Sequence, residues 1–107
     1  MEAVAIFAEP KTANDFNGQT EIRNTENGRT VVYVLLAGEG IAKIKEGTGA
    51  DVEKATLIAG GNQSKYFSAL MAGTTEIDGK PVIMEDLAEM PMKNYMRIQA
   101  AFADINF

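Results

Sequence analysis

One stretch decides the first half of the fold: NGRTVVYVLL, residues 27–36. Asn27 and Gly28 both accept the positive φ angles that a tight two-residue hairpin turn requires. The run that follows is rich in β-branched residues, whose composition favours a pleated, largely buried strand. The residues before the turn, Thr20–Arg23, can supply a partner strand. The stretch therefore predicts an antiparallel hairpin.

Further segments extend this strand-rich half of the chain. Asn17-Gly18 offers a second turn of the same kind, and residues 41–45, IAKIK, alternate apolar and basic side chains as an amphipathic strand does. We expect this third strand to lie at an edge of the sheet. The apolar run Met1–Ala8 is too short to span a bilayer and carries Glu2 where a signal peptide is basic, so we expect an edge strand or a terminal arm there.

After Gly49 the hydrophobic period becomes helical. Asp51, or Thr48 with Asp51 three residues on, can cap a first helix that should end at Gly60-Gly61. Its apolar residues recur three or four positions apart: Val52, Ala55, Ile58 and Ala59.

A second helix is expected to begin at an Asn62 cap, with Gly73 placed to take a left-handed conformation at its end. Its apolar residues predict a core-facing side: Tyr66, Phe67, Leu70 and Met71. Asp78-Gly79 then predicts a hairpin-like turn, and Met84–Glu89 a short helical stretch.

The last helix should open at Pro91, because proline suits the first turn of a helix. A broad apolar stripe is predicted along it, made of Met92, Tyr95, Met96, Ile98 and Phe102. Polar residues fall largely on the other side: Lys93, Asn94, Arg97 and Asp104.

These patterns predict an α+β protein. We expect a single domain over residues 1–107, in which residues 1–46 form an N-terminal antiparallel hairpin or meander and residues 49–107 form a bundle of three or four short helices packed against it.

The composition restricts the function. The 107 residues include no cysteine and no histidine, which removes thiolate chemistry, the commonest general base and the commonest transition-metal ligand. A net charge of -5 with scattered basic residues opposes binding to a phosphate backbone. We therefore expect no enzyme, no cofactor, no nucleic-acid partner and no membrane partner, and a cytoplasmic site of action.

Two local patterns suggest ligand-binding sites, but the spacing of their residues does not match such sites. Gly38-Glu39-Gly40 has no third glycine at the offset of a dinucleotide loop and no Gly-Lys-Ser/Thr ending, so a hairpin turn is the better interpretation. The carboxylates of Glu76 and Asp78, and those of Glu85, Asp86 and Glu89, do not match a calcium loop, and a solvated acidic face is favoured over a metal site or an acid/base pair.

Four short segments after Lys45 share a pattern with a known family. Residues 45–55, KEGTGADVEKA, resemble a basic-Glu-Pro-x-x-Gly-Asp-Leu segment, and residues 93–102, KNYMRIQAAF, resemble a closing Asp-Tyr-x-x-Leu-Gln-x-Ala-Phe helix. Leu70-Met71-Ala72 with Thr75 is similar to Leu-Ala-x-Leu-Thr, and Met84–Leu87 to a Leu-x-x-Leu step. All four belong to the small tail assembly chaperones of contractile-tailed phages, which this chain resembles over about residues 45–107.

The resemblance implies a phage or prophage protein made in the host cytoplasm. Such a chaperone transiently coats the long helical tape-measure protein, works with other tail assembly proteins until tail-tube subunits replace it, and is absent from the finished particle. The alternative is a structural tail-tube or connector subunit that uses the hairpin-rich half for assembly. Short edge strands and apolar helices are also compatible with a homo-oligomer.

Methionine is concentrated in the last two predicted helices, at Met84, Met90, Met92 and Met96. Its flexible thioether packs irregular cores and is also over-used on adaptable binding surfaces. We expect the partner-binding surface on these two helices, and some of its anchors must instead be core residues: Leu87, Met92, Tyr95, Met96 and Phe102.

Overall fold

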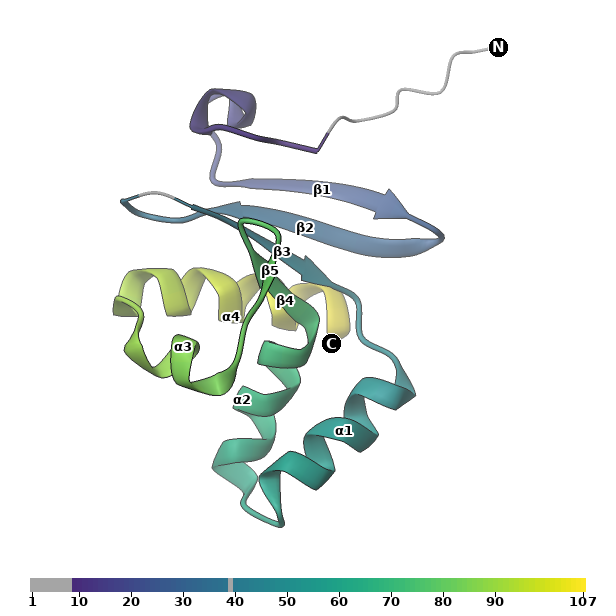
Figure 1. Ribbon diagram of the computed structural model, residues 1–107. Helices are drawn as coiled ribbons and strands as arrows, with labels where there is room; N and C mark the ends of the chain where they lie inside the picture. The colour runs from purple at the N-terminus through teal and green to yellow at the C-terminus, as the bar shows by residue number, and fades with distance from the viewer. Residues whose placement is uncertain (1–8, 39) are drawn as a thin grey trace.

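A computed structural model describes residues 9–38 and 40–107 of the chain. It confirms the α+β class, with a five-stranded antiparallel sheet and helices that follow its first three strands. Helix α4 lies along one face of the sheet, and the helices α1 and α2 extend away from the sheet (Figure 1). In chain order the elements are η1 (Ala13–Phe16), β1 (Glu21–Glu26), β2 (Arg29–Leu35), β3 (Ile41–Lys45), α1 (Gly49–Ala59), α2 (Gln63–Thr74), β4 (Thr75–Ile77), β5 (Lys80–Pro81), α3 (Met84–Glu89) and α4 (Met92–Asn106).

The predicted hairpin forms as expected. Asn27 and Gly28 take φ angles of 53° and 78°, and strands β1 and β2 pair across them from Glu26 opposite Arg29. Both central positions of a type I′ turn need positive φ, which explains the residue pair found there. The β2 strand is buried along most of its length, as its β-branched composition predicts.

The expectation that the third strand lies at an edge is wrong. The sheet order is β1-β2-β3-β4-β5, so β3 is central, with β4 paired along it from Ala42 to Ile44. Its partner β4 comes from the helical half of the chain, and the predicted Asp78-Gly79 turn, with φ angles of 52° and 81°, joins β4 to β5. Pairing between segments so distant in sequence leaves no local signal in β3 itself.

Asn17-Gly18 does not join two strands, which corrects the second hairpin prediction. Asn17 takes a left-handed conformation, φ 51°, at the end of the short helix η1. This helix places Phe16 on the face of the sheet opposite the other helices, where it is buried with Val31 and Tyr33 (Figure 1). The predicted arm or strand at Met1–Ala8 lies outside the described residues.

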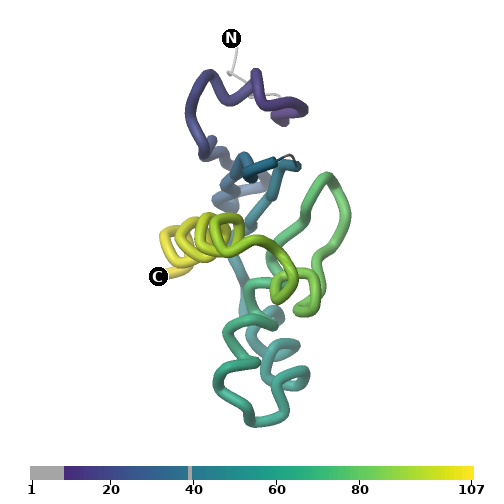
Figure 2. The backbone as a smooth tube through the Cα atoms, turned by 90° about the vertical axis from the view of Figure 1, so that its left-hand side faces the viewer, coloured from purple at the N-terminus to yellow at the C-terminus, as the bar shows by residue number. Residues whose placement is uncertain are grey.

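Helix α1 begins and ends at the predicted residues, and α2 begins at the predicted one. Asp51 accepts hydrogen bonds from the Thr48 backbone N–H at 2.9 Å and the Thr48 hydroxyl at 3.2 Å, which completes a capping box. Gly60 ends α1 with φ 58°, and Asn62 accepts from the N–H groups of Ser64 and Lys65 to cap α2. The two helices form a hairpin that projects from the sheet in both views (Figures 1 and 2).

The predicted left-handed end at Gly73 is wrong. Helix α2 continues to Thr74 and passes directly into β4, and Gly73 has no positive φ. The buried Thr74 hydroxyl donates to the carbonyl oxygens of Leu70 and Met71, at 3.1 and 3.2 Å. A strand that starts in the next residue requires an extended backbone at Thr75, so no left-handed residue is needed between them.

The main core lies between the sheet and the helices. Helix α4 packs against the strands β2 and β3 and buries Ile98 and Phe102 against the sheet face that carries Val34 and Ile44. Phe102 also meets the Phe67 ring of α2 edge to face, with centroids 5.4 Å apart. Of the helices that the structure describes, none is long and apolar enough to cross a membrane.

Candidate binding groove

The structure divides the five expected anchor residues. Leu87 and Phe102 are 2% and 1% exposed and belong to the core, so they are not surface anchors. Tyr95 is half-buried and packs against the same core. Met92 and Met96 are 79% and 54% exposed and remain available to a partner. One apolar stripe on α4 therefore wraps from the core onto the surface.

The polar side predicted for α4 is only partly exposed: Lys93 and Asp104 are exposed, whereas Asn94 and Arg97 contact the backbone at the end of β2 and just after it. Asn94 is buried and exchanges two hydrogen bonds with the Ala37 backbone: its Oδ1 accepts from the N–H at 2.8 Å, and its Nδ2 donates to the carbonyl at 3.3 Å. Arg97 donates to the Leu35 carbonyl at 2.8 Å. The chain after β2 leaves the sheet here, and its unpaired backbone groups need these partners.

Helix α1 packs in the opposite way, with small residues inside and large ones outside. Ala55 and Ala59 face α2 and are buried, whereas Leu57 and Ile58 are 82% and 52% exposed and Val52 is 42% exposed. Alanine on the inner face lets α1 approach α2 closely. The large aliphatic side chains of α1 are therefore left without a partner within the described residues.

A groove of about 310 Å³ runs beside one of these side chains, Ile58. Helix α2 lies between α1 and α3 (Figure 1), and α1 and α3 both pack on it, so residues of α2 form the floor. The floor consists of small residues: Ala69, Ala72 and Gly73. Aliphatic side chains line the two walls: Ala55 and Ile58 on the α1 side, and Val82, Ile83 and Met84 on the other.

Charged side chains stand around the groove. Asp51 and Lys54 of α1 line one wall, and Glu85 of α3 lines the other. The wall on the α3 side is strongly acidic, because residues 83–91, IMEDLAEMP, contain three carboxylates and no basic residue. Its Asp86 accepts from the Ile83 N–H at 3.1 Å, and Glu85 is an exposed negative charge that lines the groove.

Gly73 is the least expected residue of the floor. A Cβ atom added to it would meet nothing within 4 Å, and its φ is not positive. Glycine inside a helix costs about 0.5–1 kcal/mol relative to alanine. Neither a turn nor a close approach within the described chain requires glycine here. The absence of a side chain leaves the Gly73 backbone exposed to the groove.

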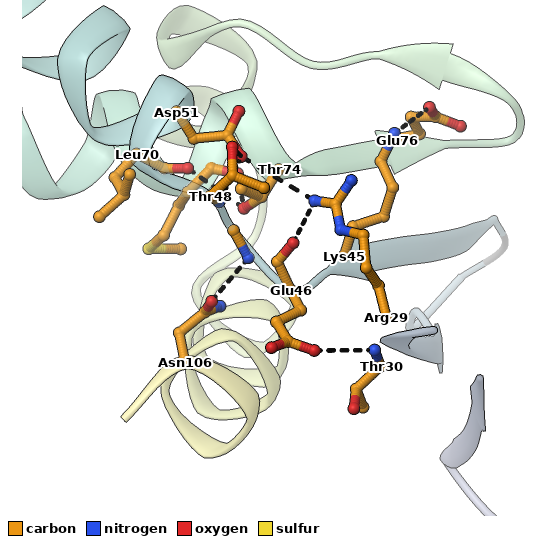
Figure 3. Close-up of polar contacts among 12 residues, drawn as sticks. Arg29, Thr30, Lys45, Glu46, Thr48, Asp51, Leu70, Thr74, Glu76 and Asn106 are labelled. Atoms are coloured by element: carbon orange, nitrogen blue, oxygen red, sulfur yellow. Dashed lines mark hydrogen bonds and ion pairs between the residues drawn. The ribbon is translucent and has the colours of Figure 1, made fainter. Parts of the chain in front are cut away.

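A polar cluster holds α1 in position relative to the sheet and α4 (Figure 3). The Asn106 Oδ1 atom accepts from the Gly47 N–H at 2.7 Å, and Glu46 accepts from the Thr30 N–H at 2.9 Å. Arg29 donates to the Glu46 carbonyl and lies 4.0 Å from Asp51. These contacts tie the segment between β3 and α1 to both neighbours, which fixes one wall of the groove.

The first of the two carboxylate clusters makes structural contacts. Glu76 accepts from the Lys45 ammonium at 3.2 Å, and Asp78 accepts from the Ile41 N–H at 3.0 Å. Within residues 9–38 and 40–107, no group of three or more His, Cys, Asp or Glu side chains is placed to hold a metal ion. Glu39 of the Gly38–Gly40 loop lies outside the described residues.

The outer face of the sheet has its own electrostatic group. The Tyr33 hydroxyl donates to Glu26, and the Lys43 ammonium lies 2.9 Å from the same carboxylate. The hydrogen bond from Tyr33, with the one from Lys43, lowers the pKa of Glu26, while burial, followed by the bond to Glu26, raises the pKa of Tyr33. The three groups therefore satisfy one another.

Sequence reasoning missed the groove. It combines residues of α1, α2 and the β5–α3 connection, and no spacing in the chain brings these together. The one available signal was Gly73 within an otherwise helical, apolar run. Comparisons of the chain with protein-family models, with curated proteins and with solved structures gave no match.

Proposed function

We propose that this protein is a non-catalytic tail assembly chaperone of a phage or prophage, which binds the tape-measure protein transiently before the tail tube polymerises. The observation that carries the proposal is the open apolar groove with Ile58 and Ile83 exposed at its walls, next to the outward Leu57. Contiguous exposed apolar surface on a small domain is typical of a protein-binding site. The resemblance over about residues 45–107 includes all three elements of the groove.

The physical demands of such a role agree with the composition. A transient coat has to bind weakly enough for tube subunits to displace it, and affinity differences of this kind reside mainly in the dissociation rate. It needs no catalytic group, and the chain has neither histidine nor cysteine. The net charge of -5 keeps a protein with exposed aliphatic side chains in solution. We place its action in the host cytoplasm.

The test is co-expression of the full chain with the tape-measure protein of the same genome, followed by affinity purification. We expect a complex that tail-tube subunits dissociate. A Leu57→Ser, Ile58→Ser double variant should bind more weakly while keeping the wild-type circular dichroism spectrum. Failure of the wild-type chain to bind the tape-measure protein would contradict the proposal.

Mass spectrometry of purified particles separates the chaperone from the structural alternative. A chaperone is absent from finished tails or present in traces, whereas a tail-tube or connector subunit is present in many copies. Recovery of this chain as an abundant component of the particle would favour the structural subunit.

A further inference from the structure

We propose that the groove between α1 and α3 receives a single amphipathic α-helix, whose aliphatic stripe lies on Ala69, Ala72 and Gly73 and whose basic residues face the acidic α3 wall. The identity of the protein that supplies this helix, the tape-measure protein, rests on the proposed function. The nature of the occupant is argued from the groove alone.

The walls and floor exclude an added strand. Most of the lining belongs to helices α1, α2 and α3, whose backbone groups are largely paired within each helix. A strand binds by pairing its backbone with a free sheet edge, whereas a helix binds by placing side chains into an apolar groove. This groove offers apolar side chains and few backbone partners, which is the requirement of a helix.

The groove floor gives the small size of Gly73 a role. Ala69, Ala72 and Gly73 have the smallest side chains available, and they occupy one side of α2 at spacings of three and four. Large residues of an incoming helix at i, i+3 or i+4, and i+7 fit between the walls of Ile58 and Ile83. The open space at the missing Gly73 Cβ is where such a residue comes closest to the α2 backbone.

The negative charge on the α3 side determines which residues are favoured on the flanks of the bound helix. Glu85, which lines the groove on the α3 side, has no basic neighbour between residues 83 and 91, so lysine or arginine on the corresponding flank of the partner is favoured and glutamate is disfavoured. A second copy of this acidic chain is a poorer fit on the same ground, since its net charge is -5.

The test uses the full chain and two synthetic peptides of about 15 residues, long enough for a marginal isolated helix. Both carry leucine at i, i+3, i+4 and i+7; one has lysine on the flanks and the other has glutamate. In NMR titrations we expect the lysine peptide to shift the amide signals of Ile58, Gly73 and Ile83. The glutamate peptide should bind at least about tenfold more weakly.

Gly73→Leu places a large side chain in the groove, and its Cβ atom meets nothing within 4 Å. We expect it to weaken binding of the lysine peptide at least about tenfold. Gly49→Leu is the matched control, since Gly49 also has open space and no positive φ but does not line this groove. Circular dichroism melting establishes that both variants fold.

Equal binding by Gly73→Leu and Gly49→Leu, or signal shifts confined to Met92 and Met96, would overturn the groove assignment. Equal affinity for the two peptides would overturn the charge argument. A dimer in sedimentation velocity that Gly73→Leu dissociates would identify a second copy as the occupant instead. Because the peptides do not derive from a phage protein, these outcomes are independent of whether the full tape-measure protein binds.

Discussion

Helices α4 and α1 have similar apolar patterns, but α4 buries large side chains and α1 buries small ones. Helix α4 buries Ile98 and Phe102 against the sheet, whereas α1 buries only the alanines 55 and 59 and leaves Leu57 and Ile58 outside. Large buried side chains stabilise a fold through the apolar area that they remove from water, and α1 contributes little of this. The difference explains why α4 contributes much of the core, whereas α1 leaves its large apolar side chains exposed.

The strongest test of this comparison removes a large side chain from α4. Phe102→Ala should lower the free energy of unfolding by about 3–5 kcal/mol, because it leaves a cavity between the sheet and the Phe67 ring. Urea denaturation followed by circular dichroism measures the loss. Met96→Ala, on the exposed part of the same helix, should stay within about 0.5 kcal/mol of the wild type. Similar losses in both variants would show that α4 has no distinct buried face.

A second test concerns the polar attachment of α4. Asn94→Ala should cost about 1–3 kcal/mol, since the Ala37 N–H loses its acceptor in a buried place. Lys93→Ala, one position away and exposed, serves as the control. If both variants unfold at the wild-type urea concentration, water has replaced the amide and the attachment contributes nothing.

In α1, a substitution on the inner face should change stability more than one on the outer face, although the outer side chains are larger. Ala55→Leu is expected to destabilise the fold by about 1–3 kcal/mol, because Ala55 is 1% exposed and lies in the α1–α2 contact. Leu57→Ala removes a far larger group and should change stability by less than about 0.5 kcal/mol. A marked loss from Leu57→Ala would mean that the outer face of α1 is packed, and would remove it from the proposed surface.

The smallest effect is electrostatic and belongs to the sheet. The folded pKa of Glu26 is below its ordinary value of 4.5, so its contribution to stability is complete above that pH and disappears as the pH falls through the folded pKa. The wild type should therefore lose stability on acidification below about pH 4.5, and Glu26→Gln should lose less. Urea midpoints at neutral and acid pH measure the difference.

For this comparison Glu53→Gln, which removes one carboxylate from α1, controls for the change in net charge. A Glu26→Gln variant with the full acid sensitivity of the wild type would show that the contact with Tyr33 does not stabilise the folded state.

The local elements were predictable because their causes are local. Asn27-Gly28 sets the turn of the β1–β2 hairpin, Thr48 with Asp51 caps α1, and Asn62 caps α2, each through contacts within a few residues. The α+β class follows from the change of hydrophobic period near Gly49. Backbone sterics and capping hydrogen bonds act over three or four residues, so a sequence read in short windows contains them.

Tertiary structure alone decided which apolar residues are core and which are free. Leu87 and Phe102 are buried while Met92 and Met96 are exposed, although all four looked alike as members of an apolar pattern. The central place of β3, the sheet-facing role of Asn94 and the groove beside Gly73 depend on segments far apart in the chain. Burial is a property of what packs on a residue, and the sequence around that residue does not contain its neighbour.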